Sequence, residues 1–294
     1  MTASGPHIDP ALGLDLKPER TLPTQERSVT VLIPAHNEEG TVSNVVQEAR
    51  RSLSALSVPG RIIVAASACT DDTSDMAASA GAEVIETPLG KGAALRVGLA
   101  DTTSDIVCIV DADVQYFGSP PLVELLVQPI LNGIADAVIS DLYWRPLYPQ
   151  LWLYGFFAPL AGRIFPELLP RVGSTPWSGQ RAALRHLWPT DLPDGFTVDL
   201  ELLLHWNQHA TNLRPVIADD WVNPQRPKPD LMEREFHLLI AHAIKAGRMT
   251  LDDQPRYDTW FAGIRRRMAD YKHGEDAPHE FEQFILRAAL SDLA

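Results

Sequence analysis

Two aspartates that directly follow an apolar run are the strongest chemical signal in this sequence. Residues 106–110 read Ile-Val-Cys-Ile-Val, and Asp111, Ala112 and Asp113 come next. The run predicts a buried strand that delivers a pair of carboxylates to its carboxyl end. Carboxylate oxygens are ligands of hard divalent cations, and such cations bind phosphates. The segment therefore indicates a metal-dependent site for a phosphorylated substrate, although short acidic turns after strands are also common.

Three further polar segments stand where a predicted strand gives way to a helix or turn. They read Pro-Ala-His-Asn-Glu-Glu over 34–39, Ser-Ala-Cys-Thr-Asp-Asp-Thr over 67–73, and Gly-Lys-Gly over 90–92. In an open α/β sheet, ligands bind outside the carboxyl ends of the strands. We therefore expect all four segments to line one edge of one sheet.

Strands and helices alternate along the first half of the chain. The pattern predicts strands over 28–33, 61–66, 83–86, 106–110 and 136–141, and helices over 38–56, 71–80 and 90–100. This alternation is typical of a parallel, doubly wound α/β sheet. Apolar periodicity predicts a further helix from Leu200 and C-terminal helices over 231–248 and 257–294. Residues 1–26 are rich in Pro, Thr and Gly without a period, which predicts a disordered arm.

The bulk properties restrict the class of protein. The 294 residues are 45% hydrophobic and 21% charged, as in an ordinary globular enzyme, and the formal net charge is −13. This charge argues against nucleic-acid binding and against docking on anionic membranes. No apolar run reaches membrane-spanning length, since the nearest candidate, 151–162, is short and contains Pro159. Without a signal-peptide pattern, we expect a cytoplasmic protein whose Cys69 and Cys108 are reduced.

The order of these motifs resembles the nucleotide-binding half of a GT-A glycosyltransferase. In particular, it is similar to the glucosyl-3-phosphoglycerate synthase family, whose members are retaining transferases that use NDP-sugars. The similarity continues through 178–180, 195–199 and 221–227. It implies a GT-A, Rossmann-like, mostly parallel sheet flanked by helices. The GT-A domain would span 27–230, with a nucleotide-binding half at 27–115 and an acceptor half at 116–230, followed by a helical C-terminal extension at 231–294.

The resemblance also implies a role for individual residues. Those expected to hold the nucleotide are Pro34, Ala35, His36, Glu38, Ser67, Lys91, Asp111 and Ala112. Lys91 suits the diphosphate because a cation on a loop with free amides attracts an anion. Asp113 would bind Mg²⁺ or Mn²⁺, Asp199 would face the donor sugar, and Arg226 would assist the departing diphosphate.

Each assignment has a structural alternative. Glu38 and Glu39 could simply begin a helix, Lys91 could be solvated, Asp199 could be an N-terminal helix charge, and Arg226 could form a surface salt bridge. Asp199 could orient the sugar, stabilise positive charge at the anomeric carbon or act as a base, so the stereochemical outcome stays open. Glu201 should point elsewhere, since helix positions two apart do not share a face.

Three positions depart from the family pattern. Ala66 stands where the family has an Asp before the residue matching Ser67. Gln225 stands where the family completes its metal site with a His, and an amide oxygen favours Mg²⁺ over softer metals. The Gly-rich turn that holds phosphoglycerate has no match in 141–180. An aromatic segment over 143–157 stands there instead, which suits a flatter acceptor or, equally, a packed or dimer-forming helix.

We therefore expect a metal-dependent, retaining glycosyltransferase. It would transfer a hexose of the glucose or N-acetylglucosamine type from a UDP-sugar to a small polar or aromatic hydroxyl acceptor, such as a nucleoside-bearing or secondary-metabolite intermediate. The alternatives are a glucosyl-3-phosphoglycerate synthase proper, a polyprenyl-phosphate sugar transferase, and a catalytically silent nucleotide-sugar-binding protein. We expect no nucleic-acid partner, no integral membrane association, and a homodimer.

Overall fold

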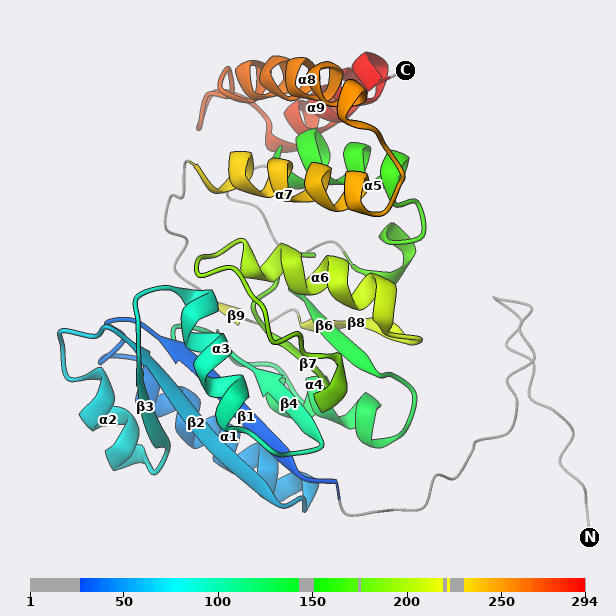
Figure 1. Cartoon of the computed structure of the whole chain (residues 1–294). Helices are drawn as coiled ribbons and strands as arrows, with labels where there is room; N and C mark the ends of the chain where they lie inside the picture. The colour runs from blue at the N-terminus through cyan, green and yellow to red at the C-terminus, as the bar shows by residue number, and fades with distance from the viewer. Residues whose placement is uncertain (1–26, 143–150, 174–175, 219–220, 223–229, 294) are drawn as a thin grey trace, which may run out of the picture.

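The chain forms a mostly parallel mixed sheet with helices on both faces (Figure 1). The computed structural model describes residues 27–142, 151–173, 176–218, 221–222 and 230–293. Within these residues, the large sheet has the strand order β3-β2-β1-β4-β7-β6-β8. Its strands are β1 (Val29–Ala35), β2 (Gly60–Ser67), β3 (Glu83–Thr87), β4 (Ile106–Ile109), β6 (Ala137–Leu142), β7 (Arg181–Leu184) and β8 (Leu213–Ala218). A small ribbon pairs β5 (Gln115–Tyr116) with β9 (Trp221–Val222).

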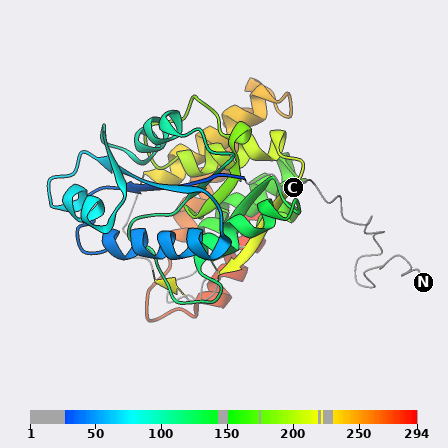
Figure 2. The same ribbon diagram turned by 90° about the horizontal axis from the view of Figure 1, so that it is seen from below.

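Helices lie on both sides of the sheet, and on the second side the C-terminal helices stack beyond α6. Those on the first face are α1 (Val42–Leu56), α2 (Thr73–Ala80) and α4 (Leu122–Leu131). Those on the second side are α3 (Lys91–Asp101), α5 (Ala158–Ile164), α6 (Val198–His209), α7 (Leu231–Lys245), α8 (Gln254–Met268) and α9 (Pro278–Leu293). Figure 2 shows α1 and α3 on opposite sides of the strands. Val31 and Ile33 of β1 enter the first core and Leu32 the second, as strand alternation requires.

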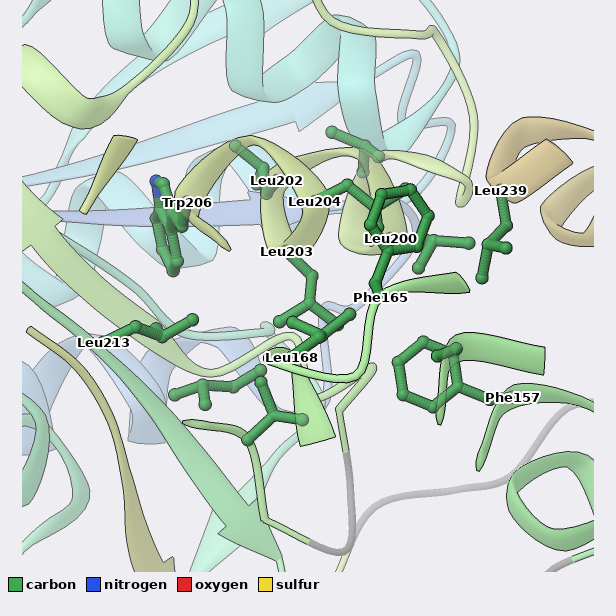
Figure 3. Close-up of a cluster of buried hydrophobic side chains, with 14 of the residues drawn as sticks. Phe157, Phe165, Leu168, Leu200, Leu202, Leu203, Leu204, Trp206, Leu213 and Leu239 are labelled. Carbon is green, nitrogen blue, oxygen red and sulfur yellow. The ribbon is translucent and has the colours of Figure 1, made fainter. Parts of the chain in front are cut away.

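The second core runs from the sheet through α6 to the C-terminal helices. Figure 3 shows the leucines of α6 together with Phe165, Leu168 and Leu239 of α7. Farther from the sheet, Phe236 of α7 stacks on Phe261 of α8 with ring centroids 4.1 Å apart. One apolar core therefore joins residues before and after residue 230, and the proposed division of the chain at that point stays a prediction.

The predicted elements form, with some shifts at their ends. Strand β1 continues through Pro34, where the prediction ended it at residue 33. Leu32 O accepts a hydrogen bond from Val110 N, so Leu32 faces the β4 side of the strand. Pro34 lies two residues later and its nitrogen faces the same side. The pairing with β4 ends at Leu32, so the missing N–H of Pro34 breaks no hydrogen bond of the sheet. Helix α1 begins at Val42 rather than at residue 38, because 36–41 form the turn over the sheet edge. The helix expected over 257–294 is two helices, α8 and α9.

Other details agree with the sequence. Gly81 ends α2 in the left-handed conformation, with φ 93°, as expected of a glycine after a helix. Cys69 and Cys108 are both free thiols, and burial raises the pKa of the Cys108 thiol. No helix in the described part of the chain is long and apolar enough to cross a membrane.

Candidate active site

Four loops meet at the carboxyl edge of β1, β2 and β4. Three of them follow these strands directly, and the fourth carries Gly90, which precedes α3. The structure adds a fifth segment that sequence reasoning did not place here. Strand β7 runs antiparallel to β4 with Ile109 opposite Arg181, so the residues just before β7 arrive at the same edge. The edge therefore gathers polar groups from both halves of the chain.

Lys91 joins two carboxylates that are far apart in the sequence. Its Nζ lies 3.0 Å from Asp111 Oδ1 and 2.9 Å from Asp199 Oδ2. The Lys91 side chain is only 8% exposed, so these are ion pairs in a poorly solvated setting. Burial alone would lower the pKa of Lys91, but the charges of Asp111 and Asp199 outweigh it, and the pKa is raised. Lys91 is therefore held as an ammonium ion between the two acids, and the solvated alternative is excluded.

Arg181 contacts the other carboxylate oxygen of Asp199. Its side chain is fully buried, and its Nη2 lies 3.3 Å from Asp199 Oδ1. Burial lowers the pKa of Arg181, while Asp199 and Asp111 act in the opposite direction. An arginine stays charged under such conditions. The centre of the site thus holds two cations and two anions in contact.

Asp111 has a second hydrogen-bond partner in the turn that precedes β7. Gln180 Nε2 donates to Asp111 Oδ2 over 3.1 Å. Between Gln180 and the buried Ser178 lies Gly179, whose backbone passes so close that a Cβ there would overlap the Asp111 carboxylate and come within 2.6 Å of Lys91 Nζ. The turn before β7 therefore packs directly on the charged centre.

The residues expected to hold a nucleoside form a connected turn beside this centre. His36 Nδ1 lies 2.6 Å from Ser67 O, and Glu38 N donates to Thr73 Oγ1 over 2.7 Å. Pro34 and Ala35 form the end of β1 beside β2. The structure thus brings together the segments after β1 and β2, with the backbone edge of residues 34–38 at the sheet edge.

Ser67 has a structural task in addition to its expected role. Its hydroxyl donates to Pro88 O over 3.0 Å and accepts from Gly90 N over 2.9 Å. It therefore braces the loop that carries Lys91. Gly90 itself has φ 127°, a conformation that favours glycine, and a Cβ there would overlap Asp194 O.

We predict that Gly92→Ala destabilises the protein by about 1–3 kcal/mol, because a Cβ at this position overlaps the backbone carbonyl of Pro193. Ala93 N also donates to Asp194 O over 3.1 Å, so the start of α3 and the 193–194 loop cannot simply separate. The free energy of unfolding, measured with urea, tests this. Gly263→Ala in α8 is the control: nothing lies within 4 Å of its Cβ, and it should be neutral or stabilising. Equal stability of the two variants would contradict the prediction.

The metal site is only partly within the described residues. Asp111, Ala112 and Asp113 follow β4, as expected, but Gln225 and Arg226 lie outside the residues that the structure describes. Among those it describes, no group of three acidic, histidine or cysteine side chains is placed to hold a metal ion. Both Asp111 oxygens already contact Lys91 and Gln180. Asp113, which follows the same strand, would supply a carboxylate oxygen, and such an oxygen suits Mg²⁺ or Mn²⁺.

Glu201 lies away from the charged centre, as the helix period predicts. Its Oε2 lies 2.8 Å from His242 Nε2 of α7. Asp199, two residues earlier, contacts Lys91 and Arg181. The prediction that these two acids would not share a face is therefore confirmed.

Sequence reasoning missed Gln180 and Arg181 as members of the site. The motif 178–180 was noted only through the family resemblance, and Arg181 was assigned no role. One signal was available: Arg181 opens a short run, Arg-Ala-Ala-Leu, that is otherwise apolar. A charged residue at the start of a buried strand needs a partner of opposite charge, and this requirement could have identified Arg181 as a site candidate.

The fold and this site define a GT-A glycosyltransferase, and comparison with known families agrees. Residues 30–187 match the model of glycosyl transferase family 2. The match covers more than half of the chain, and the chain therefore belongs to this family.

Among characterised proteins, the chain is similar to glucosyl-3-phosphoglycerate synthase of Mycobacterium tuberculosis (strain H37Rv), with 34% identity over 199 residues. The match spans 60% of this chain and 60% of that relative, less than two thirds of its length. The chain is also 30% identical over 121 residues to 4,4'-diaponeurosporenoate glycosyltransferase of Staphylococcus aureus, which covers 39% of this chain and 31% of the relative.

Solved structures show the same likeness. One is the M. tuberculosis glucosyl-3-phosphoglycerate synthase in complex with Mn²⁺, UDP-glucose and phosphoglyceric acid; it aligns with TM-score 0.60 and 28% identity over 74% of this chain and 80% of that chain. Another holds the synthase with Mg²⁺ and UDP, with TM-score 0.57 and 30% identity over 74% of this chain and 79% of that one. The M. tuberculosis synthase thus binds UDP-glucose with Mn²⁺ and UDP with Mg²⁺.

Proposed function

We propose that this protein is a metal-dependent glycosyltransferase that moves glucose, or a related hexose, from a UDP-sugar to a small hydroxyl acceptor. The observation that carries the proposal is the contact of Lys91 with both Asp111 and Asp199 at the carboxyl edge of the sheet. A lysine between two acids at this edge offers one cation for a diphosphate and two carboxylates for hydroxyl groups.

Each residue of the site would have a definite task in this reaction. The turn over 34–38, with Ser67, would hold the nucleoside, and Lys91 would bind the diphosphate. Asp113 would hold the divalent cation, with Gln225 as a further oxygen ligand; when bound, the cation supplies positive charge that offsets the charge on the departing UDP. Arg226 would act on the same diphosphate.

Asp199 would orient the donor sugar rather than remove a proton. Its Oδ2 contacts Lys91 and its Oδ1 contacts Arg181, so both oxygens are held by cations. A general base needs an oxygen that can reach the acceptor hydroxyl and take its proton. An oriented carboxylate can instead hold sugar hydroxyls and stabilise positive charge at the anomeric carbon. This arrangement supports a retaining reaction, which the resemblance to the synthase family also implies.

Of the two alternatives for the aromatic segment over 143–157, core packing holds for two of its residues. Phe156 and Phe157 are fully buried and pack in the core, Phe156 against Phe236 and Phe261, and Phe157 against Trp177. Their rings therefore cannot stack on an acceptor. The aromatic residues over 143–148 lie outside the described residues. Trp152 and Tyr154 of this segment are partly exposed, and they are the described members of it that could contact an acceptor.

Glucosyl-3-phosphoglycerate synthase proper is the second candidate function. It is supported by the 34% identity to the M. tuberculosis synthase and by the phosphoglyceric acid bound in a similar structure. The two candidates share the donor site and differ only in the acceptor. Release of UDP from UDP-glucose, with and without 3-phosphoglycerate, separates them.

A thermal-shift panel tests the donor site first. UDP, UDP-glucose and UDP-N-acetylglucosamine are each added with Mg²⁺, Mn²⁺ or EDTA, because a ligand of the native state raises Tm by mass action. We expect a metal-dependent rise with UDP and with at least one UDP-sugar, lost in Asp113→Ala and kept in the control Asp270→Ala, which removes an exposed carboxylate beyond α8. The absence of a rise with every nucleotide would overturn the proposal.

We predict that metal binding depends on the nucleotide. Because the described side chains offer no cage, Mn²⁺ titrated into the protein alone should bind with Kd no tighter than about 1 mM, and UDP should tighten it at least about tenfold. Electron paramagnetic resonance of free Mn²⁺ measures both values. Tight binding of Mn²⁺ without UDP would mean that residues outside the described ranges complete a protein site.

A further inference from the structure

We infer that Arg181 is a positioning residue that fixes the Asp199 carboxylate for the donor sugar; this rests on the proposed function. The starting point is its burial. Arg181 is fully buried at the start of β7, between β4 and β6. A guanidinium in such a place is costly unless its N–H groups are satisfied. The hydrogen-bond partners of those N–H groups show what the residue does.

The guanidinium of Arg181 binds Asp199 at two points. Its Nη1 donates to the backbone carbonyl of Asp199 over 3.0 Å, and its Nη2 lies 3.3 Å from Oδ1 of the same residue. One planar group thus holds both the main chain and the side chain of Asp199. Since the guanidinium is rigid, this double contact restricts the rotation of the carboxylate.

The same guanidinium also fixes the turn before β7. Its Nε donates to Ser178 O over 3.1 Å, and its Nη2 donates to the same oxygen. That turn continues to Gln180, which donates to Asp111. Arg181 therefore connects the first turn of α6, which carries Asp199, with the segment that holds Asp111.

The Arg181 guanidinium is also held by a contact with a buried aromatic ring. Its guanidinium carbon lies 5.5 Å from the centre of the Trp206 ring, within cation–π range. Trp206 is fully buried about two turns after Asp199 on the same face of α6, and its Nε1 donates to Leu187 O over 2.9 Å. The contacts that hold Asp199 thus extend through Arg181 to Trp206, which lies in the apolar core shown in Figure 3.

Lys91 and Arg181, the two cations beside Asp199, differ in how far their side chains are exposed to solvent. The Lys91 side chain is 8% exposed and the Arg181 side chain is 0% exposed. A bound diphosphate can therefore compete for Lys91, but it cannot reach Arg181. When Lys91 turns to the donor, Arg181 keeps Asp199 in place. Arg181 acts through Asp199 and does not itself touch the substrate.

The test compares how UDP and UDP-glucose bind to four variants in the presence of Mn²⁺, by calorimetry. The variants are Arg181→Met, Asp199→Asn, the double variant, and Arg171→Met as the control. Arg171 is a matched control because it holds the opposite end of the same helix, donating to Asn207 O over 2.6 Å and to Ala210 O over 2.5 Å.

The measured quantity is the weakening of UDP-glucose binding divided by the weakening of UDP binding. We expect about tenfold for Asp199→Asn and nearly as much for Arg181→Met, from the loss of a charge-assisted hydrogen bond to the sugar. The quotient of the double variant should not exceed that of Asp199→Asn, because both changes remove the same contact, that of the oriented Asp199 carboxylate with the sugar. Arg171→Met should lower Tm and leave the quotient at one.

Two results would overturn the inference alone: a quotient of one for Arg181→Met in a protein that binds UDP-glucose, or a double variant whose effect is the product of the single ones. If the wild type binds neither ligand, the proposed function falls and this inference falls with it. Should Arg181→Met fail to fold, Arg181→Lys keeps the charge but loses the two-point contact. The same selective loss is then expected of it, and its absence would contradict the inference.

Discussion

Lys91→Met is expected to reduce the release of UDP from UDP-glucose by about 10²- to 10³-fold and to destabilise the protein by about 3–5 kcal/mol. The variant leaves the carboxylates of Asp111 and Asp199 near one another without the ammonium that now lies 3.0 Å and 2.9 Å from them. It also removes the cation that we propose for the diphosphate. Both losses have one origin, the removal of a buried charge between two opposite charges.

Two measurements test this prediction. UDP release is followed with Mn²⁺ and saturating UDP-glucose, and the free energy of unfolding is measured with urea. Lys245→Met is the control, since Lys245 lies exposed at the end of α7. It should change neither quantity by much. A Lys91→Met variant with wild-type UDP release would remove Lys91 from the donor site, even if its stability fell.

The effect on stability should also depend on pH in a defined way. The pKa of Lys91 is raised above its ordinary value of 10.5, with burial opposing and Asp111 and Asp199 prevailing. A raised pKa means that the folded state favours the ammonium form. The stability contributed by this charge is therefore fully present below about pH 10 and is lost as the pH rises through the folded pKa. Between pH 6 and pH 9, the difference between wild type and Lys91→Met should stay constant.

Gly179→Ala is expected to reduce UDP-glucose turnover by about 10²-fold while costing at most about 1–3 kcal/mol of stability. A Cβ at Gly179 would overlap the Asp111 carboxylate and come within 2.6 Å of Lys91 Nζ. Both of these atoms are the ends of flexible side chains rather than backbone. They can move aside, so the fold survives, but the charged centre is displaced. A shift of about 1 Å at reacting groups is enough for a loss of this size.

The control for this variant is Gly263→Ala in α8, because nothing lies within 4 Å of a Cβ at Gly263, which is far from the sheet edge. Turnover and Tm are measured for both. A Gly179→Ala protein that keeps full turnover would show that the methyl group is accommodated without moving Asp111 or Lys91. In that event, the close approach of the 178–180 turn would have no part in arranging the site.

The local features of this protein could be predicted from its amino-acid pattern. The apolar run before Asp111 predicted β4, and the alternation of strands and helices predicted the mostly parallel sheet. Lys91 and Asp199 were also identified as site candidates, and in the structure Lys91 contacts both Asp111 and Asp199, while the roles of these side chains stay predictions. The strand predictions are confirmed, and because parallel strands deliver whatever follows them to one edge, candidate chemistry can be read from residues adjacent to each strand.

The pairing of the buried charges depends on the three-dimensional fold and could not be predicted from the local pattern. The run Arg-Ala-Ala-Leu gives no sign that β7 inserts antiparallel between β4 and β6, which places Arg181 opposite Ile109. Nor does local pattern show that Phe156 and Phe157 face the core rather than an acceptor. Strand order and helix docking follow from contacts between residues far apart in the chain. The partners of a buried charge are set by those contacts, and not by its sequence neighbours.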